Sequence, residues 1–200
     1  MEFREVVRRR RMVRSFEPRP IPPQVVDRVV RTTLRGPSAG FTQGTELLVL
    51  DAPDQLARFW GAVSPDRGFD RAGWPGVYNA PLVVVPFAHK AAYLARYAEP
   101  DKSWTGPNGL PDERRWPVPF WYVDAAFAAM LALLAAVDES LGALFFGIRD
   151  PAALRAAFGV PDAFDPIGAI AIGYPAPDRP SRSLRRGRRP LDEVVHRGSW

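Results

Sequence analysis

The sequence contains no cysteine and only two histidines, His89 and His196. The absence of thiols excludes disulfide frameworks, thiolate nucleophiles, iron–sulfur clusters and thiolate zinc sites. Two histidines so far apart in the chain provide few ligands for a metal ion, so we expect no metal site. Any chemistry must come from other side chains or from a bound group.

Common catalytic signatures are also missing. The chain has no G-x-S-x-G elbow, no P-loop, no G-x-G-x-x-G after a strand and no H-E-x-x-H pair. This absence favours a bound cofactor that carries the reaction while the protein binds and orients it.

Long hydrophobic runs are scarce. The longest, 125–137, is bounded by Asp124 and Asp138 and is shorter than the ~20 residues that a membrane span needs. The basic N-terminal stretch 1–11 is not followed by an apolar run, unlike a secretory signal. We therefore expect a cytoplasmic protein without a membrane partner.

A length of 200 residues fits one domain, 1–200, with a full hydrophobic core. Short β-branched or apolar runs at 46–50, 82–87 and 167–172 predict strands. A helix is expected over 2–11, and a second one from Pro22-Pro23 to Gly36-Pro37. Several helices with three or four strands predict the α+β class.

The 125–137 run is apolar all round and predicts a helix with no solvent-exposed face. Gly142 is a plausible C′ residue for it. One reading is that this helix packs against a second subunit, which we favour for so small a chain. The other is a central core helix in a monomer.

Two stretches, 64–80 and 98–119, are rich in Gly, Pro, Trp and charge, and we interpret them as loop or lid segments. An aromatic run, Trp116, Phe120, Trp121 and Tyr122, precedes the apolar helix. It could cover a planar ligand, or it could only anchor the helix and a subunit interface.

The net charge of +5 is concentrated at the two ends of the chain. Arg10, Arg11 and Arg14 lie near the start, and Arg186 and Arg188 lie near the end. Guanidinium forks match phosphate oxygens, so both ends could converge on one phosphate. A nucleic-acid arm is the alternative, but no continuous basic face or recognisable module supports it. Solvated charged faces remain a third reading.

Three motif regions follow one another along the chain. The first is Arg10-Arg11-Met12-Val13-Arg14 with Phe16 and Pro18, and the second is Pro-Ser-Ala-Gly-Phe-Thr-Gln at 37–43. The third is Gly-Tyr-Pro at 173–175 followed by Arg-Gly-Arg-Arg-Pro-Leu-Asp-Glu-Val-Val at 186–195. Together they resemble the nitroreductase superfamily, whose members are FMN-dependent NAD(P)H nitro and quinone reductases, over nearly the whole chain.

The resemblance implies a central, mostly antiparallel sheet flanked by helices, in an intertwined homodimer with shared FMN sites. For the cofactor it implies three groups of residues. The residues implied to bind the FMN phosphate are Arg10, Arg11, Met12, Arg14, Arg186 and Arg188. The residues implied to contact the ring from the partner subunit are Pro37, Ser38, Ala39 and Gln43. The backbone implied to face the flavin N5 edge is that of Phe145, Phe146 and Gly147.

Three positions depart from the family pattern. Met12 replaces the usual Ser, Phe41 replaces a frequent Asn, and Gly44-Thr45 stands where many relatives have Pro-Trp. Phe41 also resembles the benzimidazole-forming, flavin-destroying branch, although that branch carries an Asp at the Met12 position. We expect Phe41, Phe120 and Trp121 to line the substrate pocket, with simple packing as the alternative.

The resemblance implies a ping-pong reaction in which NAD(P)H supplies electrons and a small electron-poor acceptor, such as a nitroaromatic or quinone, receives them. No catalytic side chain is expected, because the flavin carries the chemistry. The alternatives are flavin fragmentation, reductive dehalogenation, a deazaflavin donor, and a flavin-binding module without turnover. We expect a homodimer that does not bind nucleic acid.

Overall fold

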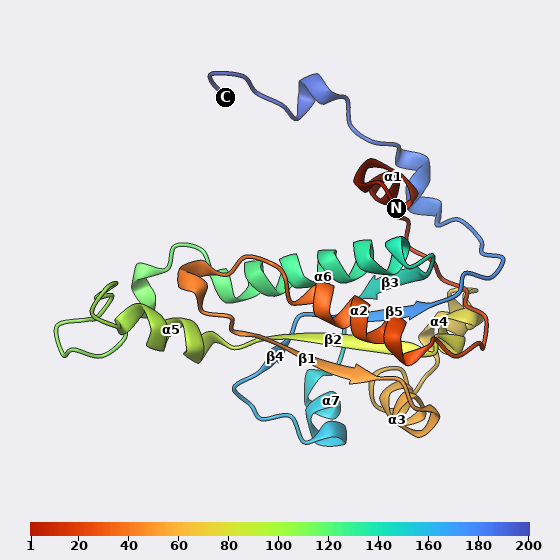
Figure 1. Cartoon of the computed structure of the whole chain (residues 1–200), viewed down its shortest axis with the longest axis horizontal. Helices are drawn as coiled ribbons and strands as arrows, with labels where there is room; N and C mark the ends of the chain where they lie inside the picture. Colours follow the sequence, from red (N-terminus) through yellow and green to blue (C-terminus); the bar gives the residue numbers. More distant parts are fainter.

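A computed structural model describes all 200 residues and contains one five-stranded sheet with helices on both faces (Figure 1). The strands are β1 (Thr45–Leu50), β2 (Leu82–Ala88), β3 (Gly142–Phe146), the short β4 (Asp165–Pro166) and β5 (Ala169–Gly173). Their order is β1-β2-β5-β3, with β4 beside β2, and every pairing is antiparallel. The predicted α+β fold with a mostly antiparallel sheet is confirmed.

Seven α-helices surround this sheet. They are α1 (Phe3–Arg9), α2 (Pro23–Thr33), α3 (Pro53–Val63), α4 (Gly68–Arg71), α5 (Lys90–Ala98), α6 (Phe120–Asp138) and α7 (Pro151–Phe158). Helices α2 and α6 cover one face of the sheet, and α3 and α7 cover the other (Figure 1). Side chains of β2 alternate accordingly: Leu82 and Val84 face α2 and α6, while Val83 and Val85 face α3 and α7.

The predicted elements lie close to the observed ones. Helix α2 begins at Pro23, as expected for proline at the first helical position, but it ends at Thr33, before Gly36-Pro37. The strand predicted over 167–172 is β5, which starts two residues later. Helices α3, α5 and α7 were not predicted individually.

The apolar helix is longer than its apolar run. Helix α6 starts at Phe120, so the aromatic residues 120–122 form its first turn. Gly142 is not its C′ residue, which corrects the sequence interpretation. Ser140 takes that place with φ 61°, in a Schellman motif closed by hydrogen bonds from Leu141 N to Ala136 O and from Ser140 N to Val137 O. Gly142 instead begins β3, where a Cβ would lie 2.7 Å from Val13 Cγ2.

Helix α6 is long and apolar enough to cross a membrane by length and composition alone. The apolar run 125–137, judged too short for a span, covers only part of this helix. More than half of it is buried inside the molecule, as in the core helix of a globular protein. Its other side is an exposed apolar strip that includes Tyr122, Phe127 and Met130. The expectation of a helix without a solvent-exposed face therefore does not hold for the single chain.

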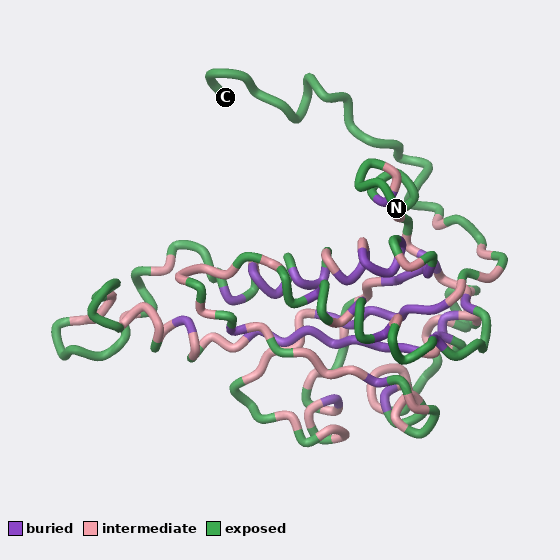
Figure 2. The backbone as a smooth tube through the Cα atoms, viewed as in Figure 1, coloured by how far each residue is buried: buried purple, intermediate pink, exposed green.

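The two segments interpreted as loops are partly helical. Segment 64–80 contains α4 and a 3₁₀ helix, η2 (Pro75–Asn79), while 98–119 contains η3 (Glu113–Arg115) and projects from the body at the left of Figure 1. The C-terminal tail, which we define as residues 180–200, is almost wholly exposed and runs away from the body (Figure 2). It contains two more 3₁₀ helices, η4 (Arg182–Arg186) and η5 (Leu191–Glu193).

Candidate functional site

The first and third sequence motifs are neighbours in the fold. After α1 the chain is extended, and Val13 N donates to Ala143 O of β3 at 2.9 Å. Next, Glu17 N donates to Tyr174 O at 2.9 Å, and Ala176 N donates to Ser15 O at 3.0 Å. The basic motif 10–14 is therefore fixed between the start of β3 and the Gly-Tyr-Pro segment at the end of β5.

Arg14 is held by contacts from both its backbone and its side chain. Its backbone N–H donates to Asp178 Oδ2 at 2.7 Å, and its guanidinium donates to Met12 O at 3.2 Å. The other oxygen of that carboxylate, Asp178 Oδ1, is buried and has no hydrogen-bond partner. A ligand or water that donates a hydrogen bond would satisfy it.

The guanidinium groups of the arginines expected to bind phosphate form no ion pairs with carboxylates. No ion pair within 4.0 Å involves any member of this set: Arg10, Arg11, Arg14, Arg186 and Arg188. Their neighbours are paired, since Arg8 and Arg9 bind Glu5 and lower the pKa of that carboxyl to about 2. Unpaired guanidinium groups are the donors that a phosphate monoester requires, so the basic motif fits the phosphate of FMN.

A small cavity of about 180 Å³ adjoins the basic motif. It is lined by Arg9 and Arg11 together with Ser140 and Gly142 from the α6–β3 connection. The basic motif thus lies at the C-terminal end of α6. Arg186 and Arg188 are exposed in the C-terminal tail, and no hydrogen bond or ion pair ties either guanidinium to the basic motif.

The second motif, 37–43, forms a strained turn. Gly40, Phe41 and Gln43 all have positive φ, at 61°, 54° and 54°. Such conformations persist in non-glycine residues only where surrounding contacts impose them. Here Gln43 N donates to Ser38 Oγ at 2.9 Å, and Arg96 Nε of α5 donates to Gly40 O at 3.0 Å.

The turn is also tied to α6 by a carboxylate that sequence reasoning did not single out. Ala39 N and the Tyr93 hydroxyl both donate to Asp124 Oδ2, each at 2.8 Å. Burial, and next the hydrogen bond to Asp124, raise the pKa of the Tyr93 phenol. A signal was available, since Asp124 is the single acid at the start of an otherwise apolar helix.

A polar cavity of about 200 Å³ lies beside this turn. Pro37, Ser38 and Gln43 line it together with Thr45 and Asp124. Three of the four predicted ring contacts therefore gather at one place, and the fourth, Ala39, binds the same carboxylate. The structure does bring the second motif together as a unit.

The second motif and the basic motif lie at opposite ends of α6 (Figure 1). Ala39 binds Asp124 near the start of the helix, whereas the N-terminal ammonium of Met1 donates to Asp138 at its end, at 2.7 Å. At 1.5 Å per residue, the span from Asp124 to Asp138 is roughly 21 Å. A single chain therefore does not bring both halves of the expected flavin site together.

At the end of β3, the residues predicted to face the flavin have their side chains packed against the protein, which leaves their backbone for a ligand. Phe145 packs into the core on the α6 side, while Phe146 points to the other face and stacks on Trp60 with ring centres 5.6 Å apart. A Cβ at the exposed Gly147 would meet nothing within 4 Å. Both phenylalanines are thus engaged in packing, and open space lies beside Gly147.

The expected pocket aromatics are placed differently from one another. Phe41 is 77% exposed at the tip of its turn, and Phe120 is also exposed. Trp121 is only 5% exposed and packs against Tyr93 and Ala125 in the core. Within the single chain Trp121 therefore serves core packing, the alternative that the sequence left open.

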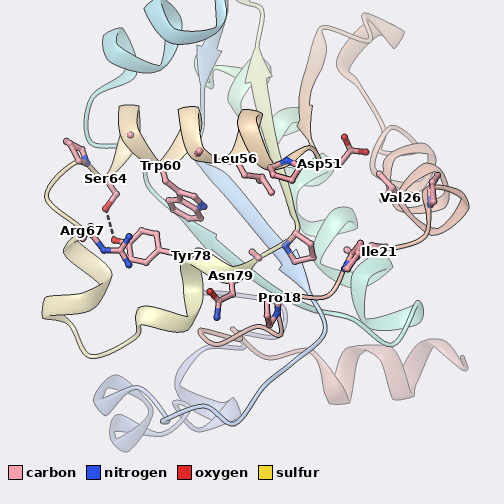
Figure 3. Close-up of a pocket in the computed structure, with 18 residues that line it drawn as sticks. Pro18, Ile21, Val26, Asp51, Leu56, Trp60, Ser64, Arg67, Tyr78 and Asn79 are labelled. Carbon is pink, nitrogen blue, oxygen red and sulfur yellow. Dashed lines mark hydrogen bonds between the residues drawn. The ribbon is translucent and has the colours of Figure 1, made fainter.

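A larger cleft lies elsewhere. A cleft of about 930 Å³ opens between the 18–23 segment, α3 and the end of η2 (Figure 3). Trp60 and Tyr78 form part of its wall, and Arg67 stacks over Tyr78 at 4.2 Å from the ring centre. None of the predicted site residues lines it, so size alone does not locate the functional site. The protein also holds no cluster of three or more His, Asp or Glu residues that could bind a metal ion.

Comparisons with known proteins agree with the motifs. A family model described as the nitroreductase family matches residues 7–174. Over 92% of this chain and 83% of its own length, a protein of Methanothermobacter thermautotrophicus named "Putative NADH dehydrogenase/NAD(P)H nitroreductase" is 24% identical. A 5,6-dimethylbenzimidazole synthase of Rhodobacter capsulatus is 29% identical over 86% of this chain and 82% of its own.

Solved structures show the same fold. A nitroreductase family protein from Clostridium difficile 630 superposes with a TM-score of 0.72 at 21% identity, with 100% of both chains covered. An FMN-dependent nitroreductase from Clostridium difficile R20291 gives a TM-score of 0.68 at 18% identity, with 98% of both chains covered. Because the family model extends from the basic motif to the Gly-Tyr-Pro segment, the chain belongs to the nitroreductase family.

Proposed function

We propose that this protein is an FMN-dependent oxidoreductase that passes electrons from NADH or NADPH to a small electron-poor acceptor, such as a nitroaromatic or a quinone. The observation that carries the proposal is the set of unpaired arginines in the family's phosphate motif, with Arg10, Arg11 and Arg14 fixed beside β3. The FMN-dependent structural neighbour and the relative named for NAD(P)H support the cofactor and the donor.

Bound FMN would supply the hydride and electron chemistry, and the protein would supply position and charge. Arg10, Arg11 and Arg14 would hold the phosphate, with Arg186 and Arg188 added from the C-terminal tail. The backbone around Gly147 would border the ring, where open space remains. The donor and the acceptor would use the same space in turn, which gives ping-pong kinetics.

The active form would be a homodimer with two shared sites. The basic motif and the 37–43 turn are separated by most of the length of α6, so the turn of one subunit would meet the arginines of the other if the two α6 helices pack antiparallel. The exposed apolar strip of α6, with Phe127 and Met130, supports such packing. A twofold dimer places the same strip on both subunits.

Absorbance and turnover test the function directly. The purified protein should carry one FMN per chain, seen as flavin absorbance, and anaerobic NADH or NADPH should bleach it. Adding a quinone or a nitroaromatic should restore the absorbance and give parallel lines in double-reciprocal plots. A colourless protein that does not take up added FMN would contradict the proposal.

Flavin fragmentation is the second candidate, because the relative from Rhodobacter capsulatus is a 5,6-dimethylbenzimidazole synthase. Gly40-Phe41 in the turn favours this branch, and Met12 in the basic motif disfavours it. Chromatography of a reaction that contains FMN, NADPH and oxygen would distinguish the two. Loss of FMN with formation of a benzimidazole indicates fragmentation, whereas unchanged FMN with oxidised NADPH indicates a reductase.

A further inference from the structure

Asp124 is the only buried residue among the acidic and basic side chains of the protein, with 4% of its surface exposed. No Lys, Arg or His nitrogen lies within 4.0 Å of its carboxylate. Burying an acid without a cationic partner costs free energy unless strong hydrogen bonds compensate. An apolar residue would suit the surrounding helix better, so this position calls for a specific role.

The hydrogen bonds of Asp124 indicate that role. A single oxygen, Oδ2, accepts from Ala39 N and from the Tyr93 hydroxyl at 2.8 Å each. Ala39 is the first residue of the strained part of the 37–43 turn, and Tyr93 belongs to α5. The carboxylate thus joins three elements, α5, α6 and the turn, through one atom.

The turn needs such fixing because three of its residues adopt left-handed backbone conformations. Gly40 is packed so tightly that a Cβ would lie 2.7 Å from Tyr97 Cε2. In this conformation Phe41 is exposed to solvent and Gln43 lies beside the polar cavity. Strain of this kind relaxes when a tie is removed.

We infer that Asp124 is a positioning residue that holds the 37–43 turn in the shape required to contact the flavin ring bound by the partner subunit's arginines. The inference rests on the proposed function. Asp124 acts through Ala39 and touches neither cofactor nor substrate. Its role depends on the oxygen that accepts the hydrogen bond from Ala39 N. An isosteric amide at this position can still accept that hydrogen bond.

The test compares three variants of the full-length protein, each loaded with FMN. Asp124→Ala removes the acceptor, and Asp124→Asn keeps an oxygen in the same place. Asp138→Ala is the matched control, because it removes an exposed acid from the other end of the same helix. The measurements are the FMN dissociation rate, the absorbance band of bound flavin, and the melting temperature of the FMN-free protein.

Asp124→Ala should raise the FMN dissociation rate about tenfold or more and shift the flavin band towards that of free FMN, because the hydrogen-bond acceptor of Ala39 N is lost and the turn can relax. Asp124→Asn should stay within about threefold of the wild-type rate, and Asp138→Ala should match the wild type. An Asn variant that fails as badly as the Ala variant would overturn the role of the acceptor oxygen.

The inference is also overturned if Asp124→Ala lowers only the melting temperature and leaves both the dissociation rate and the band unchanged. That result would mean that Asp124 serves folding alone. A wild-type protein that binds no FMN would instead overturn the proposed function, and the inference with it. A protein that binds FMN but oxidises neither nicotinamide would overturn the electron donor while leaving the role of Asp124 intact.

Discussion

The guanidinium of Arg14 lies 5.0 Å from the centre of the Trp74 ring, and that of Arg179 lies 5.7 Å from the same ring. Trp74 also donates from Nε1 to Arg179 O at 3.2 Å. A residue of the 64–80 segment thus links the basic motif to Arg179, which directly precedes the C-terminal tail. Cation–π contacts of this kind orient an arginine without neutralising it, which keeps Arg14 free to bind an anion.

Arg14→Ala should weaken FMN binding about tenfold or more, because it removes a charge-assisted contact to phosphate. Arg14→Lys should recover only part of the loss, since an ammonium lacks the planar fork. Fluorescence titration of the FMN-free protein measures both affinities.

Arg8→Ala is the matched control for this experiment. Arg8 lies on the same basic segment, but it is exposed and already paired with Glu5. FMN affinity should stay unchanged in this variant. Equal losses in the Arg8 and Arg14 variants would show that only overall charge matters.

Met130→Glu should separate the proposed dimer. Met130 is 50% exposed in the single chain, within the apolar strip of α6, so the charge would not harm the protomer core. In a dimer it would be buried without a partner, at a cost of several kcal/mol. Light scattering on the protein eluted from a size-exclusion column should show a monomer, and its absorbance should show that FMN has been lost. Leu110→Glu, on an exposed apolar residue outside α6, is the control and should remain dimeric.

Replacing Leu131 or Leu134 would be less informative. Both side chains line a cavity near α1 together with Phe3 and Val6, so a charge there would disturb the protomer itself. A yellow, monomeric Met130→Glu protein would contradict the shared site.

Truncating the two aromatic residues Phe41 and Trp121, both predicted to line the pocket, should give two different outcomes. Phe41→Ala should leave stability and FMN content unchanged but lower kcat/KM for a quinone several-fold, because the exposed ring is free to contact an acceptor. Trp121→Ala should destabilise the protein by about 3–5 kcal/mol, because its ring is in the core. Urea unfolding measures the stability of both variants, and steady-state kinetics measure their kcat/KM. An unchanged kcat/KM in Phe41→Ala would remove this residue from the pocket.

The ion pair between Arg28 and Glu139 should make stability depend on pH. Arg28 donates two hydrogen bonds to this carboxylate, at 2.7 and 2.8 Å, and they hold the pKa of Glu139 below its ordinary value of 4.5. A depressed pKa stabilises the fold above about pH 4.5 and ceases to do so as the pH falls through the folded-state pKa.

Glu139→Gln should therefore lower the urea midpoint slightly at about pH 7 and have no effect at a pH below the folded-state pKa. The effect should be small because Arg28 is largely exposed. Glu193→Gln, on an exposed tail residue paired with Arg189, should change neither midpoint. An equal loss for Glu139→Gln at both pH values would rule out the ion pair as the cause.

The sequence alone predicted several of the local elements and the family. Proline at the start of α2, β-branched runs at β1, β2 and β5, and the apolar run of α6 act over a few residues, so they can be recognised without a structure. The three motif regions did the same for the family, and the match over residues 7–174 confirms it. The end of α6 was misplaced because a non-glycine residue, Ser140, adopts the left-handed conformation there.

Only the tertiary structure decided how the motifs are distributed in space. It put Val13 on Ala143, and so placed the basic motif at the C-terminal end of α6. Ala39 was tied to Asp124 at the other end, and Trp121 was buried while Phe41 was left exposed. The two hydrogen bonds, Val13 to Ala143 and Ala39 to Asp124, join residues more than 80 positions apart. They depend on how helices and strands pack, which no short stretch of sequence encodes.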